Sequence, residues 1–302
     1  MNLADRMQKF QDWFTQQWVI FSGKKINPFE NTWLLGSFGE VNGIGEKFIH
    51  QLAEKESLTI IRNSNSKGIL NSISSLKLQE NEIKNLSKKV IDFYEKTSEY
   101  KLQLKVKWNP IFKIFGYVVN RLFSQRINQL NIPTNNIKSS ENLTSEIIEL
   151  VSKKNNELKH TIWLRKFQST GKVIYSGIYT TCTLPSGITC VKAIFPLPKG
   201  NATVILKPSI GEKNELILNS SGNQFGDAGF YFLLNDAKGN CWSKYIKSFT
   251  DKLIVSDKNG RLIAEQTLKL WKFKVATFEY EMEKITPKSK GEHITRYCQK
   301  RG

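Results

Sequence analysis

The sequence predicts an α+β fold: an N-terminal helical segment followed by a large curved antiparallel sheet or open barrel, packed on a long amphipathic helix. Three observations predict it. Helical spacing dominates the first hundred residues, ten segments with strand character follow residue 144, and one long apolar helix lies between them. Because the strands are not separated by helices in a regular alternation, a parallel doubly wound sheet is disfavoured.

The first hundred residues contain three segments with helical periodicity. Leu3 to Phe21 carries apolar side chains on one face, which is typical of a helix that covers a core, and docking on a partner or a membrane surface is the alternative. Glu46 to Glu56 is a second helical segment, and Leu86 to Tyr100 is a third. The stretch 62–80 is rich in Ser and Asn and predicts an irregular connection.

The pattern changes at residue 101. Residues 101–108 alternate between lysine or glutamine and apolar side chains, which predicts a half-buried strand. Asn109 and Pro110 then supply a helix cap and a first helical residue. The apolar positions of the following segment predict a long amphipathic helix over 110–131.

Strand patterns dominate the rest of the chain. Pro185–Gly187, Gly211–Asn214, Asp236–Gly239 and Asp257–Gly260 are chemically suited to the turns between strands. One segment between strands, Trp242 to Phe249, has aromatic and apolar residues at helical spacing and predicts a short helix. The predicted strands are 145–151, 160–168, 172–184, 188–195, 201–207, 214–220, 228–235, 251–257, 261–271 and 273–283.

We expect three regions along the chain. Residues 1–85 form an N-terminal helical and irregular region, and residues 86–285 form the β-rich domain that contains the long helix 110–131. The polar residues 286–302 form a basic tail.

The chain is strongly basic, with 45 Lys and Arg against 27 Asp and Glu and a formal net charge of +18. Only eight of these basic residues are arginine, the side chain best suited to forked phosphate and guanine contacts, which argues against a nucleic-acid partner. The excess is either a compositional bias or an anionic-surface site in segments 101–140 and 284–302. Lys113, Arg121 and Arg126 are the candidate residues of that site, because they lie on the amphipathic helix.

Cysteine and histidine give no pattern of a metal site, and we expect no metal and no cofactor. Cys182 and Cys190 lie symmetrically about a turn, so they are placed to face each other across two strands. With neither a secretion signal nor an 18-residue apolar stretch in view, we expect a cytoplasmic protein with reduced thiols.

A strongly curved sheet encloses space, which makes its interior the default ligand site. The polar candidates for that cavity are Arg165, Tyr175, Lys192, Asp227 and Tyr231. Each has a structural alternative: a solvent-facing charge for the two bases, a local turn hydrogen bond for Asp227, and a core aromatic with a bonded hydroxyl for the two tyrosines. We find no pair of carboxylates spaced for acid–base catalysis.

Several short phrases of the sequence stand out: Phe93–Tyr94, Trp108–Pro110, Gln129–Pro133, Phe195–Pro198 and Phe225–Tyr231. They resemble a family of uncharacterised bacterial proteins, similar to the soluble C-terminal part of the YndJ-type membrane proteins. The resemblance spans roughly residues 90–283 and implies a bacterial source, no known activity and no catalytic residue to transfer. This chain departs from the family in that we expect no membrane-spanning half, so the resemblance alone does not establish a membrane role.

The leading functional hypothesis is a binding module that holds a small apolar or amphipathic, lipid-like molecule inside the curved sheet. An enzyme that uses the same cavity is the second hypothesis. Association with an anionic membrane surface or a partner through the two basic segments is the third. Sequence alone leaves the ligand and the oligomeric state open.

Overall fold

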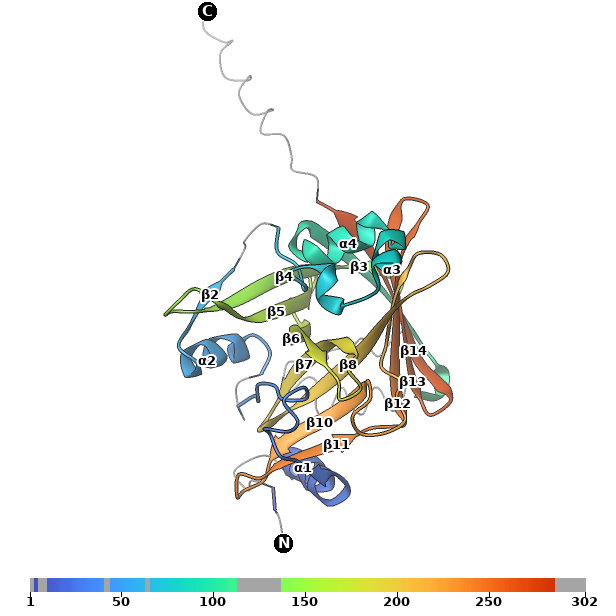
Figure 1. The fold of residues 1–302 in the computed structure, drawn as a ribbon. Helices are drawn as coiled ribbons and strands as arrows, with labels where there is room; N and C mark the ends of the chain where they lie inside the picture. Colours follow the sequence, from blue (N-terminus) through green and yellow to red (C-terminus); the bar gives the residue numbers. More distant parts are fainter. Residues whose placement is uncertain (1–2, 5–9, 41–43, 63–65, 113–136, 286–302) are drawn as a thin grey trace, which may run out of the picture.

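The computed structural model describes residues 3–4, 10–40, 44–62, 66–112 and 137–285 (Figure 1). The helices are α1 (Phe10–Ser22), α2 (Lys47–Lys55), α3 (Glu80–Asn85) and α4 (Lys88–Glu95), with short 3-10 turns at Ile73–Leu76 and Thr97–Glu99. The strands are β1 (Lys24–Lys25), β2 (Leu58–Ile61), β3 (Tyr100–Trp108), β4 (Ile137–Ser152), β5 (Leu158–Phe167), β6 (Val173–Thr183), β7 (Thr189–Leu197), β8 (Gly200–Ile210), β9 (Leu216–Asn219), β10 (Gly229–Asn235), β11 (Cys241–Tyr245), β12 (Phe249–Lys258), β13 (Arg261–Leu270) and β14 (Phe273–Lys284).

Ten antiparallel strands close into a barrel, in the order β8-β7-β6-β5-β4-β3-β14-β13-β12-β9. Closure depends on the long strand β8. Its second half, Lys207 to Ile210, pairs with β9, and β9 in turn pairs with β12. The sheet is therefore closed rather than open, which satisfies backbone groups that an open edge would leave unpaired.

The first half of β8 pairs with a different strand. Residues Gly200 to Ile205 bond to β10, which continues through β11 to the two-residue strand β1. This three-stranded extension leaves the barrel beside β9 (Figure 1). The rings of Phe230 on β10 and Phe249 on β12 are 5.3 Å apart, so the two strands meet where β9 ends.

The barrel interior is the main hydrophobic core. Inward rows from β3, such as Leu102, Leu104 and Val106, share one cluster with residues from nearly every barrel strand. One end of the barrel is covered by α4, whose Phe93 and Tyr94 belong to the same cluster. Figure 1 shows α3 and α4 together over this end.

The outer face of β4 to β8 is also buried, so these strands have apolar residues on both faces. Helix α2 packs Phe48, Ile49 and Leu52 on one part of this face, against side chains such as Ile148 and Ile162. The segment around Trp33 and Leu34 covers another part, next to β6 to β8 and β10. This double burial explains why strand β7 has no polar face.

Strand patterning predicted most of the sheet correctly. The predicted turns also form, with Gly187, Asn259 and Gly260 in the left-handed region that tight hairpins require. Cys182 and Cys190 lie opposite each other in register, as predicted, and both are buried free thiols.

The helix predicted over Trp242–Phe249 is wrong, because Cys241–Tyr245 form β11 instead. Cys241 and Ser243 alternate as buried positions, and the strand bonds to β10 along its whole length. The Trp242 indole donates to Asp236 at 3.0 Å across the hairpin. Hydrogen bonding to β10 thus determines the structure of this segment, although four of its side chains have helical spacing.

The predicted helix 110–131 lies almost wholly outside the described residues. Residues 110–112 are helical, and the packing of a long helix on the barrel stays a prediction. The predicted helix 86–100 is shorter than expected: α4 ends at Glu95 and β3 already begins at Tyr100. Likewise, the described helix of the first segment begins at Phe10.

Candidate functional site

The barrel encloses a cavity of about 340 Å³. Inward side chains of β3, β5 to β9 and β12 to β14 line it, joined by α4 at one end and by Phe230 of β10. The walls are largely aromatic and aliphatic. Volume and lining both match those of small-molecule sites.

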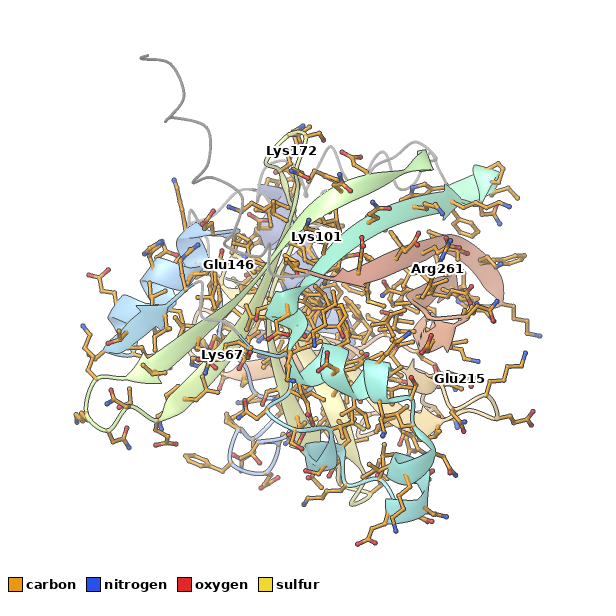
Figure 2. The ribbon with its side chains drawn as sticks, turned by 90° about the horizontal axis from the view of Figure 1, so that it is seen from above. Lys67, Lys101, Glu146, Lys172, Glu215 and Arg261 are labelled. Carbon is orange, nitrogen blue, oxygen red and sulfur yellow. The ribbon has the colours of Figure 1, made fainter. Side chains whose placement is uncertain are left out.

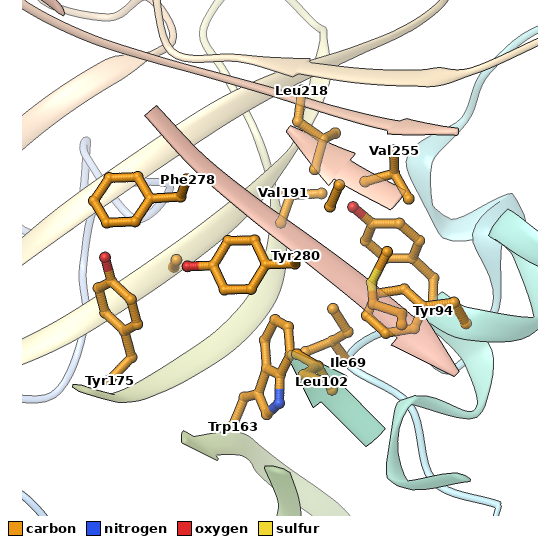
Figure 3. Packing of buried hydrophobic residues seen from close by; sticks show 14 of the residues in the cluster. Ile69, Tyr94, Leu102, Trp163, Tyr175, Val191, Leu218, Val255, Phe278 and Tyr280 are labelled. Carbon is orange, nitrogen blue, oxygen red and sulfur yellow. The ribbon is translucent and has the colours of Figure 1, made fainter. Parts of the chain in front are cut away.

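A cluster of polar side chains interrupts the apolar wall. Its members come from five strands and all line the cavity: Arg165 (β5), Tyr175 and Tyr179 (β6), Asp251 (β12), Gln266 (β13) and Tyr280 (β14). Figure 3 shows the Tyr280 side chain with its hydroxyl directed to the side of Tyr175, and with Trp163 below it in the view. The barrel therefore contains a site with convergent polar groups rather than a uniform apolar core.

Arg165 is the cation of the cluster and is only 7% exposed. It lies next to Tyr175 in the register of β5 and β6, with its guanidinium carbon 4.4 Å from the ring of Tyr175 and 3.9 Å from that of Trp163. One Nη donates to the Tyr179 hydroxyl at 2.9 Å. The aromatic faces favour the positive charge electrostatically.

Asp251 is the carboxyl group of the cluster. It interrupts an inward row of apolar residues on β12 that includes Phe249, Leu253 and Val255. Burial raises its pKa to about 7, although the hydrogen bond from Gln266 Nε2, at 2.7 Å, opposes this rise. Asp251 is thus a buried acid able to change charge near neutral pH.

Three polar atoms of these residues are buried without a hydrogen-bond partner in the described structure. They are Nε of Arg165, Oδ1 of Asp251 and the hydroxyl oxygen of Tyr280. Burial raises the Tyr280 pKa to about 12, against a lowering by Arg165, so the hydroxyl keeps its proton. Because unpaired buried polar atoms are rare in folded proteins, three of them around one cavity make it the candidate site of this structure.

Gly177 leaves room in the barrel beside this cluster. It lies on the inner face of β6 opposite Trp163 in register. A Cβ atom there would lie only 2.8 Å from the ring of Phe195. The missing side chain therefore allows Phe195, Tyr175 and Tyr179 to form one aromatic wall.

Of the five cavity residues suggested by the sequence, the structure brings together Arg165 and Tyr175. It places the other three outside the cavity. Lys192 is buried on the outer face of β7, where its Nζ donates to the carbonyls of Trp33 at 3.0 Å and Leu35 at 2.9 Å. Its partners are therefore backbone groups of the segment that covers the barrel.

Asp227 and Tyr231 form a local structure near the turn that precedes β10. The Asp227 carboxylate accepts from the backbone N–H groups of Asn223 and Gln224, and its carbonyl accepts from the Tyr231 hydroxyl. Tyr231 packs among aromatic rings that include Trp33. Asp227 thus makes turn hydrogen bonds, and Tyr231 is a core aromatic residue with a bonded hydroxyl. These are the structural alternatives given for both residues in the sequence analysis.

Sequence reasoning missed Tyr179, Asp251, Gln266 and Tyr280. For Asp251 a signal exists, because a single acid in the row Phe249, Leu253 and Val255 breaks the period-two pattern of a half-buried strand. The tyrosines and the glutamine carry no comparable signal, since such residues occur on either face of a strand.

The anionic-surface candidates Lys113, Arg121 and Arg126 lie outside the described residues. The described part of segment 101–140 points its lysines outward from β3, opposite acids of β14. Lys105 pairs with Glu279 at 3.1 Å, and Lys101 is in register with Glu283. Figure 2 shows that labelled basic residues such as Lys172 and Arg261 lie apart on the surface. This part of the surface is a mixture of charges.

A second, wider groove of about 1380 Å³ lies outside the barrel wall between α4, β3, β4 and β14. Its lining mixes polar and apolar side chains, and several of its charges already have partners. Asp92 accepts from Lys284 at 2.6 Å and pairs with Lys96 at 3.0 Å. We therefore place the candidate site in the smaller, mostly apolar cavity.

No group of three or more metal-ligating His, Cys, Asp or Glu side chains occurs among the residues that the structure describes. Within the described ranges, none of the helices combines the length and apolar character needed to cross a membrane.

Comparison with known proteins gives one relative. The chain is 26% identical over 244 residues to "Uncharacterized membrane protein YndJ" of Bacillus subtilis. This chain is distantly related to YndJ. The similar region covers 80% of the chain and 42% of the relative, so the YndJ-like chain matches less than half of that protein. The resemblance seen in the sequence is thereby confirmed.

No protein-family profile matches the YndJ-like chain. No solved structure is similar to it either. The relative's name states a membrane protein without a known activity, so the site must be interpreted from its own geometry.

Proposed function

We propose that the barrel of this YndJ-like chain binds a small, largely apolar or amphipathic molecule in its interior. The observation that carries the proposal is the cavity of about 340 Å³, with its apolar walls and its cluster of incompletely bonded polar groups. Few voids larger than a water molecule occur in ordinary protein interiors. Space left unfilled in a core carries a free-energy cost, because the side chains around it lose packing contacts.

A bound ligand would fill this space and so explains why the barrel retains it. Closely packed side chains would stabilise a barrel whose only role is structural. The inner wall instead carries the small residues Ala193, Ala202 and Ala264, which keep the space open.

Isothermal titration of the full, delipidated chain with 1-octanol, a probe small enough for the cavity, tests the proposal. We expect saturable binding of one molecule per chain. Ala193→Leu, which fills part of the cavity, should weaken octanol binding at least several-fold. Thr180→Leu adds apolar volume on the exposed side of β6 and should leave octanol binding unchanged. Equal binding by both variants would contradict an interior site.

A second candidate function is an enzyme that uses the same cavity. Asp251 favours it, because a buried carboxyl group with a pKa of about 7 can take up or release a proton at neutral pH. The test is to incubate the protein with a bound molecule and then identify what is recovered by mass spectrometry. Conversion that Asp251→Asn abolishes would support the enzyme, and unchanged recovery would support binding alone.

A cytoplasmic location forms part of the proposal. Cys182 and Cys190 face each other across β6 and β7 as free thiols, which is the usual state in a reducing compartment. Alkylation of the thiols in intact cells, followed by mass spectrometry, tests it: cysteines recovered as a disulfide would contradict this location.

A further inference from the structure

The cation in the barrel, Arg165, is buried, with a relative exposure of only 7%. Among the described residues, no carboxylate lies within ion-pair distance of its guanidinium. A guanidinium stays charged in proteins, so it cannot escape burial by losing its proton. A buried charge is costly unless a partner of opposite sign compensates it.

The existing contacts compensate Arg165 only in part. Of the five N–H donors of the guanidinium, one is used in the hydrogen bond to Tyr179, and Nε is buried without a partner. The rings of Trp163 and Tyr175 are neutral and offer only their electron-rich faces.

Asp251, the acid that lines the same cavity, does not neutralise Arg165. One of its oxygens accepts from Gln266, and the other has no hydrogen-bond partner. An arginine beside a carboxylate lowers its pKa, whereas the pKa of Asp251 is raised to about 7 by burial. Among the described residues, the cavity therefore contains one fixed positive charge and one acid that is largely protonated below neutral pH.

We propose that the barrel binds a medium-chain carboxylate, with its head group on the Arg165 guanidinium and the Tyr280 hydroxyl and its tail along the apolar wall. This inference rests on the proposed binding function and names its ligand class. A carboxylate matches the planar fork of an arginine and brings the single negative charge that the cavity lacks. It also supplies an acceptor for the Tyr280 hydroxyl, which has none in the described structure.

The volume sets the length of the tail. At about 30 Å³ for a group of the size of water, 340 Å³ holds roughly eleven such groups. Octanoate and decanoate have about this number of non-hydrogen atoms. The rows Val191–Ala193 on β7 and Ala202–Leu206 on β8 offer an aliphatic surface for such a tail.

Isothermal titration of the full, delipidated chain with decanoate, 1-decanol and decylamine tests the proposal. The three probes share a tail and differ in the charge of the head group. We expect decanoate to bind at least tenfold more tightly than decanol and decylamine to bind weakest. Arg165→Met should weaken decanoate binding roughly 10- to 100-fold, because charge-assisted hydrogen bonds are lost, with little effect on decanol. Tyr280→Phe should weaken decanoate binding about 2- to 10-fold.

Lys192→Met is the matched control, since Lys192 is a second buried cation in the same barrel but lies outside the cavity. It should leave the preference for decanoate unchanged. If decanol and decanoate bind equally well and Arg165→Met affects neither, the carboxylate assignment is overturned while the binding function stands. If none of the three probes binds to the folded wild-type chain, both proposals are overturned.

Discussion

Replacing Asp251 with asparagine should stabilise the protein, and more so as the pH rises. The side chain is fully buried in the barrel, and burial raises its pKa from the ordinary 3.8 to about 7. Between these two values the unfolded chain is ionised while the folded chain keeps the proton, so the folded state loses stability as the pH increases. The whole penalty, reached above pH 7, is about 4 kcal/mol at 1.36 kcal/mol per pKa unit.

Urea unfolding of wild type and Asp251→Asn at pH 5 and pH 8, without added ligand, measures this effect. We expect the stability advantage of the variant to grow by roughly 2 to 3 kcal/mol between the two pH values, which follows from the same two pKa values. An advantage that is equal at both pH values, or that shrinks towards pH 8, would refute a raised pKa for Asp251.

Asp236→Asn provides the control with the opposite sign. Burial raises the pKa of Asp236, but hydrogen bonds from Asn240, Trp242 and backbone N–H groups outweigh it and bring the pKa to about 2. The stabilisation by this carboxylate is fully present once the pH exceeds the ordinary pKa of 3.8, and it is therefore the same at pH 5 and at pH 8. Asp236→Asn should therefore destabilise the protein by the same amount at pH 5 and pH 8.

Three further predictions concern the barrel wall and its outer cover. Gly177→Ala should cost about 1 to 3 kcal/mol of unfolding free energy in urea, because its Cβ would lie 2.8 Å from the Phe195 ring, and an unchanged midpoint would contradict that packing. Burial raises the pKa of Cys182 to about 11 and that of Cys190 to about 12, so both thiols should react with a thiol reagent orders of magnitude more slowly in the folded than in the unfolded chain. Lys192→Met removes the donor for two carbonyls of the covering segment, so limited proteolysis should cleave that segment faster than in wild type.

The sequence was sufficient to predict most of the strands, with β1, β2 and β11 as exceptions, but not the closure of the barrel. Alternating side chains and turn residues define each strand locally, as in β3 and in the hairpin around Gly187. Closure depends on the last residues of β8 bonding to the short strand β9, while its first residues bond to β10. The pairing of one strand with two different partners depends on the stagger of all the strands around the barrel. No local sequence pattern encodes this stagger.

The same limit applies to the site. Arg165 and Lys192 both interrupt apolar strands, and the sequence offered both as cavity residues. The structure separates them, because β7 is buried on both faces and its alternation does not indicate which face is interior. Asp251 stands in an otherwise apolar row, and that pattern could have identified it.

A crystal structure of the delipidated chain mixed with decanoate tests the central claim most directly. The account predicts electron density for one molecule inside the barrel, with its carboxylate on the Arg165 guanidinium and its tail between β7 and β8. A barrel whose interior is filled by its own side chains, or a decanoate bound only on the outer surface, would contradict it.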